Sequence, residues 1–229
     1  MTGIVGLIAL NAAQATVVVT TANQIGDGVN TFNPTFTPIN TAADLLYHLA
    51  PSASAGSFTL EISGGIPILN DGAFGPLTTG TVGSHPALAT VGTGGGAGTS
   101  LTYTLPTAKV LQSFVVYGGW NDNGRDQQLF NVSYSLDGTS FLPLGSVDFN
   151  PTVAEKLQSA TQVTFTDSTG SFAAGVPIKA LTITYPNGVE NGYAGVTEVA
   201  AYAVPEPNSI ALAVVGGTGL LGMLRRRKA

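Results

Sequence analysis

The clearest indication of the fold is the stretch FNVSYSLDGTSF at residues 130–141. Its apolar side chains fall on every second position up to Tyr134, which places them on one buried face of a strand. Asp137-Gly138 follows, and glycine readily adopts the positive φ angle that a tight hairpin turn requires. The stretch therefore predicts two antiparallel strands joined by a turn at these two residues.

The same two-residue period recurs along the chain. It is clear at residues 101–105 and 181–185, and further strands are expected at 57–62, 110–117, 141–147, 162–167 and 196–203. One short helix is expected at residues 41–49, with Thr41 as its N-cap and Asp44 three residues later. So many short strands with so little helix predict an all-β protein, an antiparallel β-sandwich of the jelly-roll type.

Composition limits the function classes. The chain has 229 residues, enough for one large β domain plus targeting segments, and charged residues make up only 9% of it. It contains no cysteine, which excludes disulfides, thiolate nucleophiles and cysteine-ligated metals. The formal net charge is -5, and four of the eight basic residues lie at positions 225–228. The body is therefore expected not to bind nucleic acid, since phosphate contacts need clustered Lys and Arg.

The N-terminal segment, residues 1–15, reads as a signal peptide. Residues 4–10 are apolar, and Ala13-Gln14-Ala15 fits the small-x-small pattern of a cleavage site. No Lys or Arg precedes Lys109, so we expect the true start to lie upstream of Met1. The alternative is a buried first strand. The signal peptide predicts export, with the β-sandwich body at residues 16–203.

The C-terminal segment, residues 204–229, has three parts in order. A Pro205-Glu206-Pro207 motif precedes an uncharged apolar run at 210–224, and a basic block follows. As a helix the run would span about 22 Å, short of the roughly 30 Å hydrocarbon core, but flanking arginines can anchor a short transmembrane helix. The basic block contains Arg225, Arg226, Arg227 and Lys228.

This tail resembles the PEP-CTERM sorting signal. The resemblance implies a bacterium of the Gram-negative type, recognition by an exosortase and transient anchoring in the inner membrane. It further implies removal of the tail during delivery to the cell surface or extracellular matrix. Pro205, Glu206 and Pro207 would be the sorting motif, and Arg225, Arg226 and Arg227 would fix the topology.

The body carries a second resemblance. Residues 130–141 look like the F-x-V-x-Y-S-x-D-G stretch of discoidin (coagulation factor 5/8 type C) domains, and residues 196–202 look like their closing E-x-x-x-Y strand. This implies a galactose-binding-like jelly roll. The chain departs from the pattern in lacking the cysteine pair of animal members and in a glycine-rich loop at 92–98.

One polar cluster is a candidate ligand site. The segment 118–126 holds the only Trp of the chain and the only Arg outside the tail. An exposed indole could cover the C–H face of a sugar while amides and charges bond its hydroxyls, so Trp120, Asn121, Asp122 and Arg125 are the candidate carbohydrate-binding residues. The alternative is a structural corner, with Trp120 packed on the core and Arg125 paired to a neighbouring Asp.

Two acidic residues suggest a structural calcium ion. Asp71 lies in the turn 69–72, and Glu198 is expected to open the last strand. In galactose-binding-like folds such loop and strand ends often share a calcium, and carboxylates with backbone carbonyls suit that ion. The alternative is an Asx-turn at Asn70-Asp71 and an exposed Glu198.

Catalysis is not expected. The two histidines, His48 and His85, lack a G-x-S-x-G nucleophile motif, so no catalytic residue is assigned. The sequence thus predicts an exported, non-catalytic, carbohydrate-binding β-sandwich with polysaccharide as its partner. The alternative is a structural protein of the exopolysaccharide matrix without a discrete ligand site.

Overall fold

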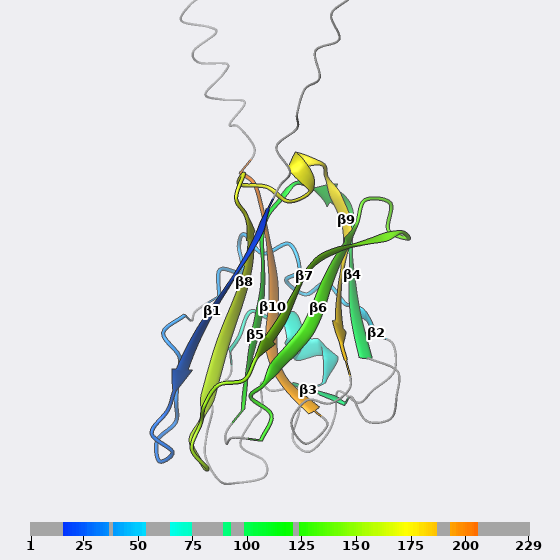
Figure 1. The fold of residues 1–229 in the computed structure, drawn as a ribbon. Coiled ribbons are helices and arrows are strands. Elements are labelled where there is room, and N and C mark those ends of the chain that lie inside the picture. Colours follow the sequence, from blue (N-terminus) through cyan, green and yellow to red (C-terminus); the bar gives the residue numbers. More distant parts are fainter. Residues whose placement is uncertain are drawn as a thin grey trace, which may run out of the picture.

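The computed structural model describes residues 16–36, 39–53, 65–74, 89–92, 99–120, 124–186 and 193–205. Two five-stranded antiparallel sheets pack face to face, which confirms the predicted all-β sandwich (Figure 1). The first sheet has the order β1 (Val17–Ile25), β8 (Ser159–Asp167), β5 (Leu111–Trp120), β10 (Tyr193–Ala203) and β3 (Ala89–Gly92). The second has the order β2 (Ser52–Ala53), β4 (Thr99–Lys109), β9 (Ile178–Tyr185), β6 (Gln128–Ser135) and β7 (Phe141–Phe149). Two short 3₁₀ helices are η1 (Ile66–Asn70) and η2 (Phe172–Gly175).

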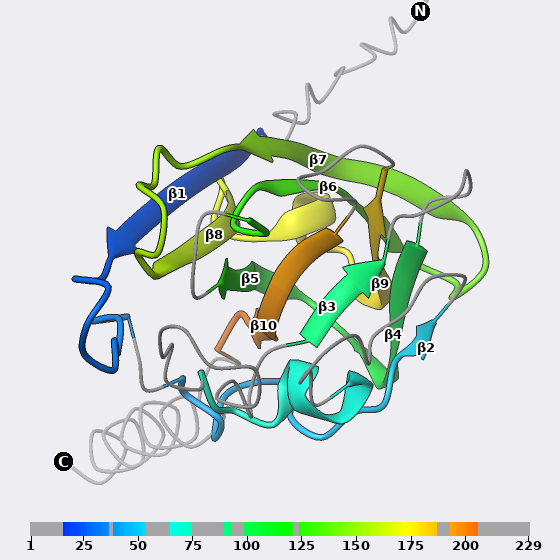
Figure 2. The same cartoon turned by 90° about the horizontal axis from the view of Figure 1, so that it is seen from below.

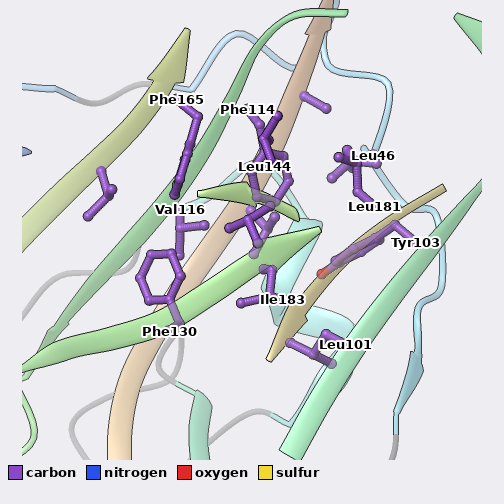
Figure 3. Close-up of a cluster of buried hydrophobic side chains, with 14 of the residues drawn as sticks. Leu46, Leu101, Tyr103, Phe114, Val116, Phe130, Leu144, Phe165, Leu181 and Ile183 are labelled. Atoms are coloured by element: carbon purple, nitrogen blue, oxygen red, sulfur yellow. The ribbon is translucent and has the colours of Figure 1, made fainter. Parts of the chain in front are cut away.

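The main core lies between the two sheets and follows the predicted alternation. Phe165 of β8 contacts Phe114 of β5 at a ring-centroid distance of 6.1 Å and Phe130 of β6 at 6.3 Å. Every second residue of β4, β6 and β9 adds to this layer (Figure 3). Fully buried members include Leu101, Tyr103, Phe114, Val116, Phe130, Phe165, Leu181 and Ile183.

A second buried cluster covers the outer face of the first sheet. Tyr117 of β5 packs there against Phe36, from the irregular segment after β1, and against Phe74, which follows η1. Because both faces of β5 are covered, every residue from Phe114 to Trp120 is buried. The period of two cannot reveal such a second core, since both sets of alternating side chains are apolar.

The predicted hairpin is confirmed. β6 and β7 pair antiparallel, and Gly138 between them has a φ angle of 86°. The Asp137 carboxylate accepts hydrogen bonds from the backbone N–H groups of Thr139 and Ser140 at 2.7 Å. These bonds lower the pKa of Asp137 well below its usual value, so the ionised side chain stabilises the turn.

The prediction of a helix at residues 41–49 is wrong. The segment forms turns, and the Asp44 carboxylate accepts hydrogen bonds from the N–H groups of Leu46 at 2.9 Å and of Ala201 at 2.8 Å. Leu45 N–H in turn donates to the Ala201 carbonyl at 2.8 Å. The segment therefore docks on the edge of β10 instead of closing its own helical hydrogen bonds.

Both ends of the body lie at the same end of the sandwich. Val17, at the start of β1, pairs with Asp167, and Ala203, at the end of β10, pairs with Leu111. β1 was not predicted as a strand. The signal peptide, the strand at 57–62, His85 and the segment 206–229, with its expected transmembrane helix, lie outside the described residues. Within the described ranges, no helix is long and apolar enough to cross a membrane.

Candidate functional site

The candidate ligand residues Trp120 and Arg125 lie at the opposite end of the sandwich, which is seen end-on in Figure 2. β5 ends there at Trp120, β6 begins there at Gln128, β9 ends at Tyr185 and β10 begins at Tyr193. The β5–β6 and β9–β10 connections therefore start and finish at the same end. This end is the one farthest from both ends of the body.

The β5–β6 connection is tied to the start of β10 at Gly195. Its N–H group donates to the Arg125 carbonyl at 2.8 Å, and its carbonyl accepts from the Gln128 side chain at 3.3 Å. The backbones come very close here, because a Cβ added at Gly195 would lie 2.2 Å from the Gly119 carbonyl oxygen. Sequence reasoning missed this contact. The signal was the pair Gly118-Gly119 inside an apolar strand, since glycine in a strand often marks a close backbone approach.

Trp120 is buried, so the expectation of an exposed indole is wrong. Its side chain is 3% exposed and packs in the outer cluster with Val115, Tyr117 and Ala160. Trp120 is the last residue of β5, and its packing on the core is what the structural-corner alternative expected. The indole therefore offers no open face on which a sugar ring could stack.

Arg125 is positioned by Trp120. Its guanidinium carbon lies 4.7 Å from the centroid of the indole ring, a cation–π contact that contributes about 0.5–1 kcal/mol at partly exposed sites. Arg125 is half-buried, whereas the next residue, Asp126, is 1% exposed. Asn121 and Asp122 lie outside the described residues. Of the four candidate residues, the structure thus brings Trp120 and Arg125 together.

The two predicted calcium ligands also come together. Gly72 N–H, in the turn after η1, donates to Glu198 Oε2 at 3.1 Å, and Asp71 is close enough to raise the pKa of Glu198. A bulge between Val196 and Glu198 shifts the register of β10 and turns the Glu198 side chain towards this turn. Glu198 lies inside β10 and does not open it, which corrects the prediction of its place.

The environment of Glu198 is unlike that of a surface carboxylate. Glu198 is fully buried, so the alternative of an exposed side chain is wrong, although the expected Asx-turn is present between Asp71 Oδ1 and Ala73 N–H at 2.9 Å. Burial and the neighbouring Asp71 raise the pKa of Glu198 to about 9. Its Oε1 atom accepts no hydrogen bond from the described residues. A buried carboxylate in this state needs either a proton or a cation.

The donor set fits a hard cation. Two carboxylates and a turn with backbone carbonyls are the ligands that calcium prefers. The part of the chain that the structure describes contains no group of three or more His, Asp or Glu side chains that could hold a metal. A calcium ion beside Asp71 and Glu198 would therefore complete its shell with backbone carbonyls and water.

We expect calcium to stabilise the protein through this pair. A hundredfold excess over the dissociation constant should raise the free energy of unfolding by about 2.7 kcal/mol, because only the folded state brings the ligands together. Thermal unfolding with calcium and with chelator measures the effect. Glu198→Gln should abolish the calcium response, while the surface variant Asp148→Asn should keep it. A melting temperature that ignores calcium would contradict the prediction.

In chelator, stability should depend on pH in a defined direction. The unfolded chain releases the Glu198 proton near pH 4.5, but the folded protein keeps it to about pH 9. Between these values the folded state binds more protons, so stability should fall as pH rises. Glu198→Gln removes this contribution and should flatten the profile. Equal slopes for the parent and the variant would show that Glu198 is not the group responsible.

Comparisons with known proteins assign no family to the chain. No protein-family model matches the chain, and no curated protein matches it. Similar solved structures include a family 32 CBM from C. perfringens NanJ in complex with galactose, with 16% identity over 69% of this chain and 98% of that one and a TM-score of 0.45. A Streptococcus pneumoniae fucose binding module has 11% identity over 70% and 95%, with a TM-score of 0.45.

A third is chitosan-binding module 1 from a chitosanase/glucanase of Paenibacillus sp. IK-5, with 12% identity over 70% of this chain and 98% of that one and a TM-score of 0.44. These TM-scores lie below 0.5. The proposals below therefore rest on the residues of this chain.

Proposed function

We propose that this protein is an exported, non-catalytic β-sandwich that binds carbohydrate at the end of the sandwich opposite its own termini. The observation that carries the proposal is the hydrogen bond from Gly195 N–H to the Arg125 carbonyl, which holds the β5–β6 connection against the start of β10. The β5–β6 connection contains Asn-Asp-Asn at 121–123, and the β9–β10 connection reads NGVENG at 187–192. Amides, carboxylates and one arginine are the groups that bond sugar hydroxyls.

The role of Trp120 in this proposal differs from the sequence interpretation. In this proposal the buried indole does not contact the sugar but packs against the Arg125 guanidinium. A guanidinium fixed in this way loses little side-chain freedom when it binds a ligand, because its position is already set. Arg125 is therefore the described residue that we assign to carbohydrate binding, with Asn121 and Asp122 as its sequence neighbours.

The resemblance to discoidin domains supports the same reading. Residues 130–141 form the β6–β7 hairpin, and residues 196–202 lie in β10, the last strand of the body. His48, the histidine within the described residues, sits in a turn with its ring 3.9 Å from that of Tyr47. We propose no catalytic role for this histidine.

The position of residue 205, at the end of the described body, suits a protein anchored through a C-terminal tail. β10 has 11 residues, so it separates Tyr193 from Ala203 by about 33 Å along the strand. Pro205, the first residue of the Pro205-Glu206-Pro207 motif, follows closely at the end of the body. Anchored through this tail, the protein would present the carbohydrate-binding end away from the membrane and towards the matrix.

A glycan array tests the binding proposal. Residues 16–205 contain both sheets and both buried clusters, so this body can be tested as a folded unit. Binding of a defined group of sugars would support a carbohydrate-binding module. If the body bound no neutral, acidic or amino sugar, the binding proposal would be overturned. The alternative, a structural matrix protein without a ligand site, would then be favoured.

The sorting tail has its own test. Neutral residues in place of Arg225, Arg226 and Arg227, or alanines in place of Pro205-Glu206-Pro207, should leave the protein unprocessed in the membrane fraction. The arginines would fix the topology of the apolar segment and the motif would be read by the exosortase. Immunoblots of fractionated cells measure processing. Normal processing and surface delivery of both variants would refute the proposed tail function.

A further inference from the structure

β1 is an edge strand of the first sheet that lacks the usual protection of such edges. Exposed strand edges present free N–H and C=O groups, and proteins shield them with short strands, proline, bulges or charges. β2 has two residues and β3 has four, while β7 carries Pro143, Asp148 and a bulge opposite Val132 and Ser133. β1 lies at one edge of the first sheet (Figure 1), and its nine residues, VVVTTANQI, include neither proline nor charge.

The hydrogen-bond pattern between β1 and β8 shows which backbone groups of β1 point away from the sheet. Thr16, opposite Ser168, accepts from its N–H at 3.0 Å, and Gly26, opposite Gln158, donates to its carbonyl at 2.9 Å. In an antiparallel pair such bonds recur at every second residue. The even-numbered residues therefore bond to β8, and the backbone groups of Val17, Val19, Thr21, Asn23 and Ile25 point away from the sheet.

The side chains leave this edge accessible. All five residues from Val18 to Ala22 are exposed, including Val18 at 42% and Val19 at 38%. Within the described part of the chain, β1 pairs only with β8. A strip of β-branched residues with open backbone groups on one side can accept another extended strand.

We propose that this edge docks a second copy of the same chain, by antiparallel pairing of the two β1 strands about Thr21. In this register Thr21 pairs with Thr21 of the second copy, Val19 pairs with Asn23 and Val17 pairs with Ile25. Each residue whose backbone groups point away from β8 therefore pairs with another such residue. The pairing provides about ten backbone hydrogen bonds, two for each hydrogen-bonded pair.

Charge and symmetry favour a second copy as the occupant. The chain carries a net charge of -5, yet residues 16–26 contain no charged side chain, so two copies meet here without like-charge contacts. The pairing is two-fold and uses the β1 strand of both copies, so it closes at a dimer and leaves no β1 edge for a third copy. Strand pairing alone forms a small interface, so the dimer should be reversible and concentration-dependent.

The dimer has a defined orientation. β1 starts at the end of the sandwich where β10 finishes, so antiparallel pairing places the two C-terminal ends at opposite ends of the dimer. Two copies held in one membrane could not pair in this way. Copies on facing surfaces, or copies released from the membrane, could.

Single cysteines test the register, because the chain has no cysteine of its own. In the proposed dimer the two Thr21 Cα atoms are about 5.5 Å apart, within the range for a disulfide. Thr21→Cys in the full chain, purified in mild detergent, should therefore form a disulfide-linked dimer on mild oxidation. Val18→Cys is the control, since the two Val18 residues would be about 20 Å apart.

Sedimentation velocity supplies the second measurement. The parent should shift from monomer towards dimer as its concentration rises, whereas Thr21→Pro, which removes an outward-facing N–H and leaves the bonds to β8 intact, should remain monomeric at the same concentrations. Circular dichroism confirms that this variant is folded. A parent that is monomeric at every concentration would overturn the proposal, and so would equal cross-linking of Thr21→Cys and Val18→Cys, which indicates unordered edge contacts.

Discussion

Replacing Trp120 with alanine should lower the free energy of unfolding by about 3–5 kcal/mol, the usual cost of deleting a large buried aromatic side chain. Trp120 is 3% exposed, and its neighbours Tyr117 and Ala160 are themselves held in strands that cannot move in to fill the space. Urea unfolding followed by circular dichroism measures the loss.

Trp120→Phe is the matched control, because it keeps most of the packing while it weakens the cation–π contact with Arg125. This variant should lose less than half as much stability as Trp120→Ala. The indole is also the only Trp of the chain, so the parent should show the blue-shifted fluorescence of a buried indole. If Trp120→Ala left the free energy of unfolding almost unchanged and the parent showed red-shifted emission, Trp120 would instead be an exposed residue available to a ligand.

Gly195→Ala should be strongly destabilising for the addition of a single methyl group. The new Cβ would lie 2.2 Å from the Gly119 carbonyl oxygen and 3.0 Å from that of Arg125. Both contacts are with backbone, so the strands must separate, at a cost of about 1–3 kcal/mol or more. The same shift would weaken the hydrogen bond from Gly195 to Arg125 and disturb the carbohydrate-binding end.

Gly170→Ala is the control that separates the steric clash at Gly195 from the general cost of replacing a glycine. Gly170 has a φ angle of 88°, so alanine is strained there, but a Cβ would meet nothing within 4 Å. We expect the loss of stability at Gly170 to be clearly smaller than at Gly195, with ligand binding unchanged. Equal losses in the two variants would show that the close strand approach at Gly195 is unimportant.

Sequence periodicity predicted the strands that have one polar face. β6 and β9 alternate apolar and small polar residues, and both were found with their core face correct. β1 was missed because its sequence, VVVTTANQI, does not alternate, and an edge strand exposed on both faces imposes no such pattern. The sandwich could therefore be predicted from its central strands but not from this edge.

Tertiary contacts explain the other errors. The capping tendency of Asp44 was recognised, but one of its partners is Ala201 N–H on a distant strand, a contact that no local pattern contains. Trp120 is buried because the segment after β1 covers the outer face of the sheet. The proximity of Asp71 and Glu198 was predicted from a family resemblance. The burial of Glu198 was not predicted, because it depends on a bulge in β10 that the sequence does not show.

Arg125 gives the most direct test of carbohydrate binding. The body, residues 16–205, and its Arg125→Gln variant are titrated by calorimetry with the strongest ligand from the glycan array. Loss of a charged hydrogen bond costs about 1.5–3 kcal/mol, so the affinity should fall at least tenfold. Lys109→Gln, at the far end of β4, makes the same change of charge and should bind like the parent. Equal affinity of the Arg125 variant and the parent, or a parent that binds no glycan, would contradict the account.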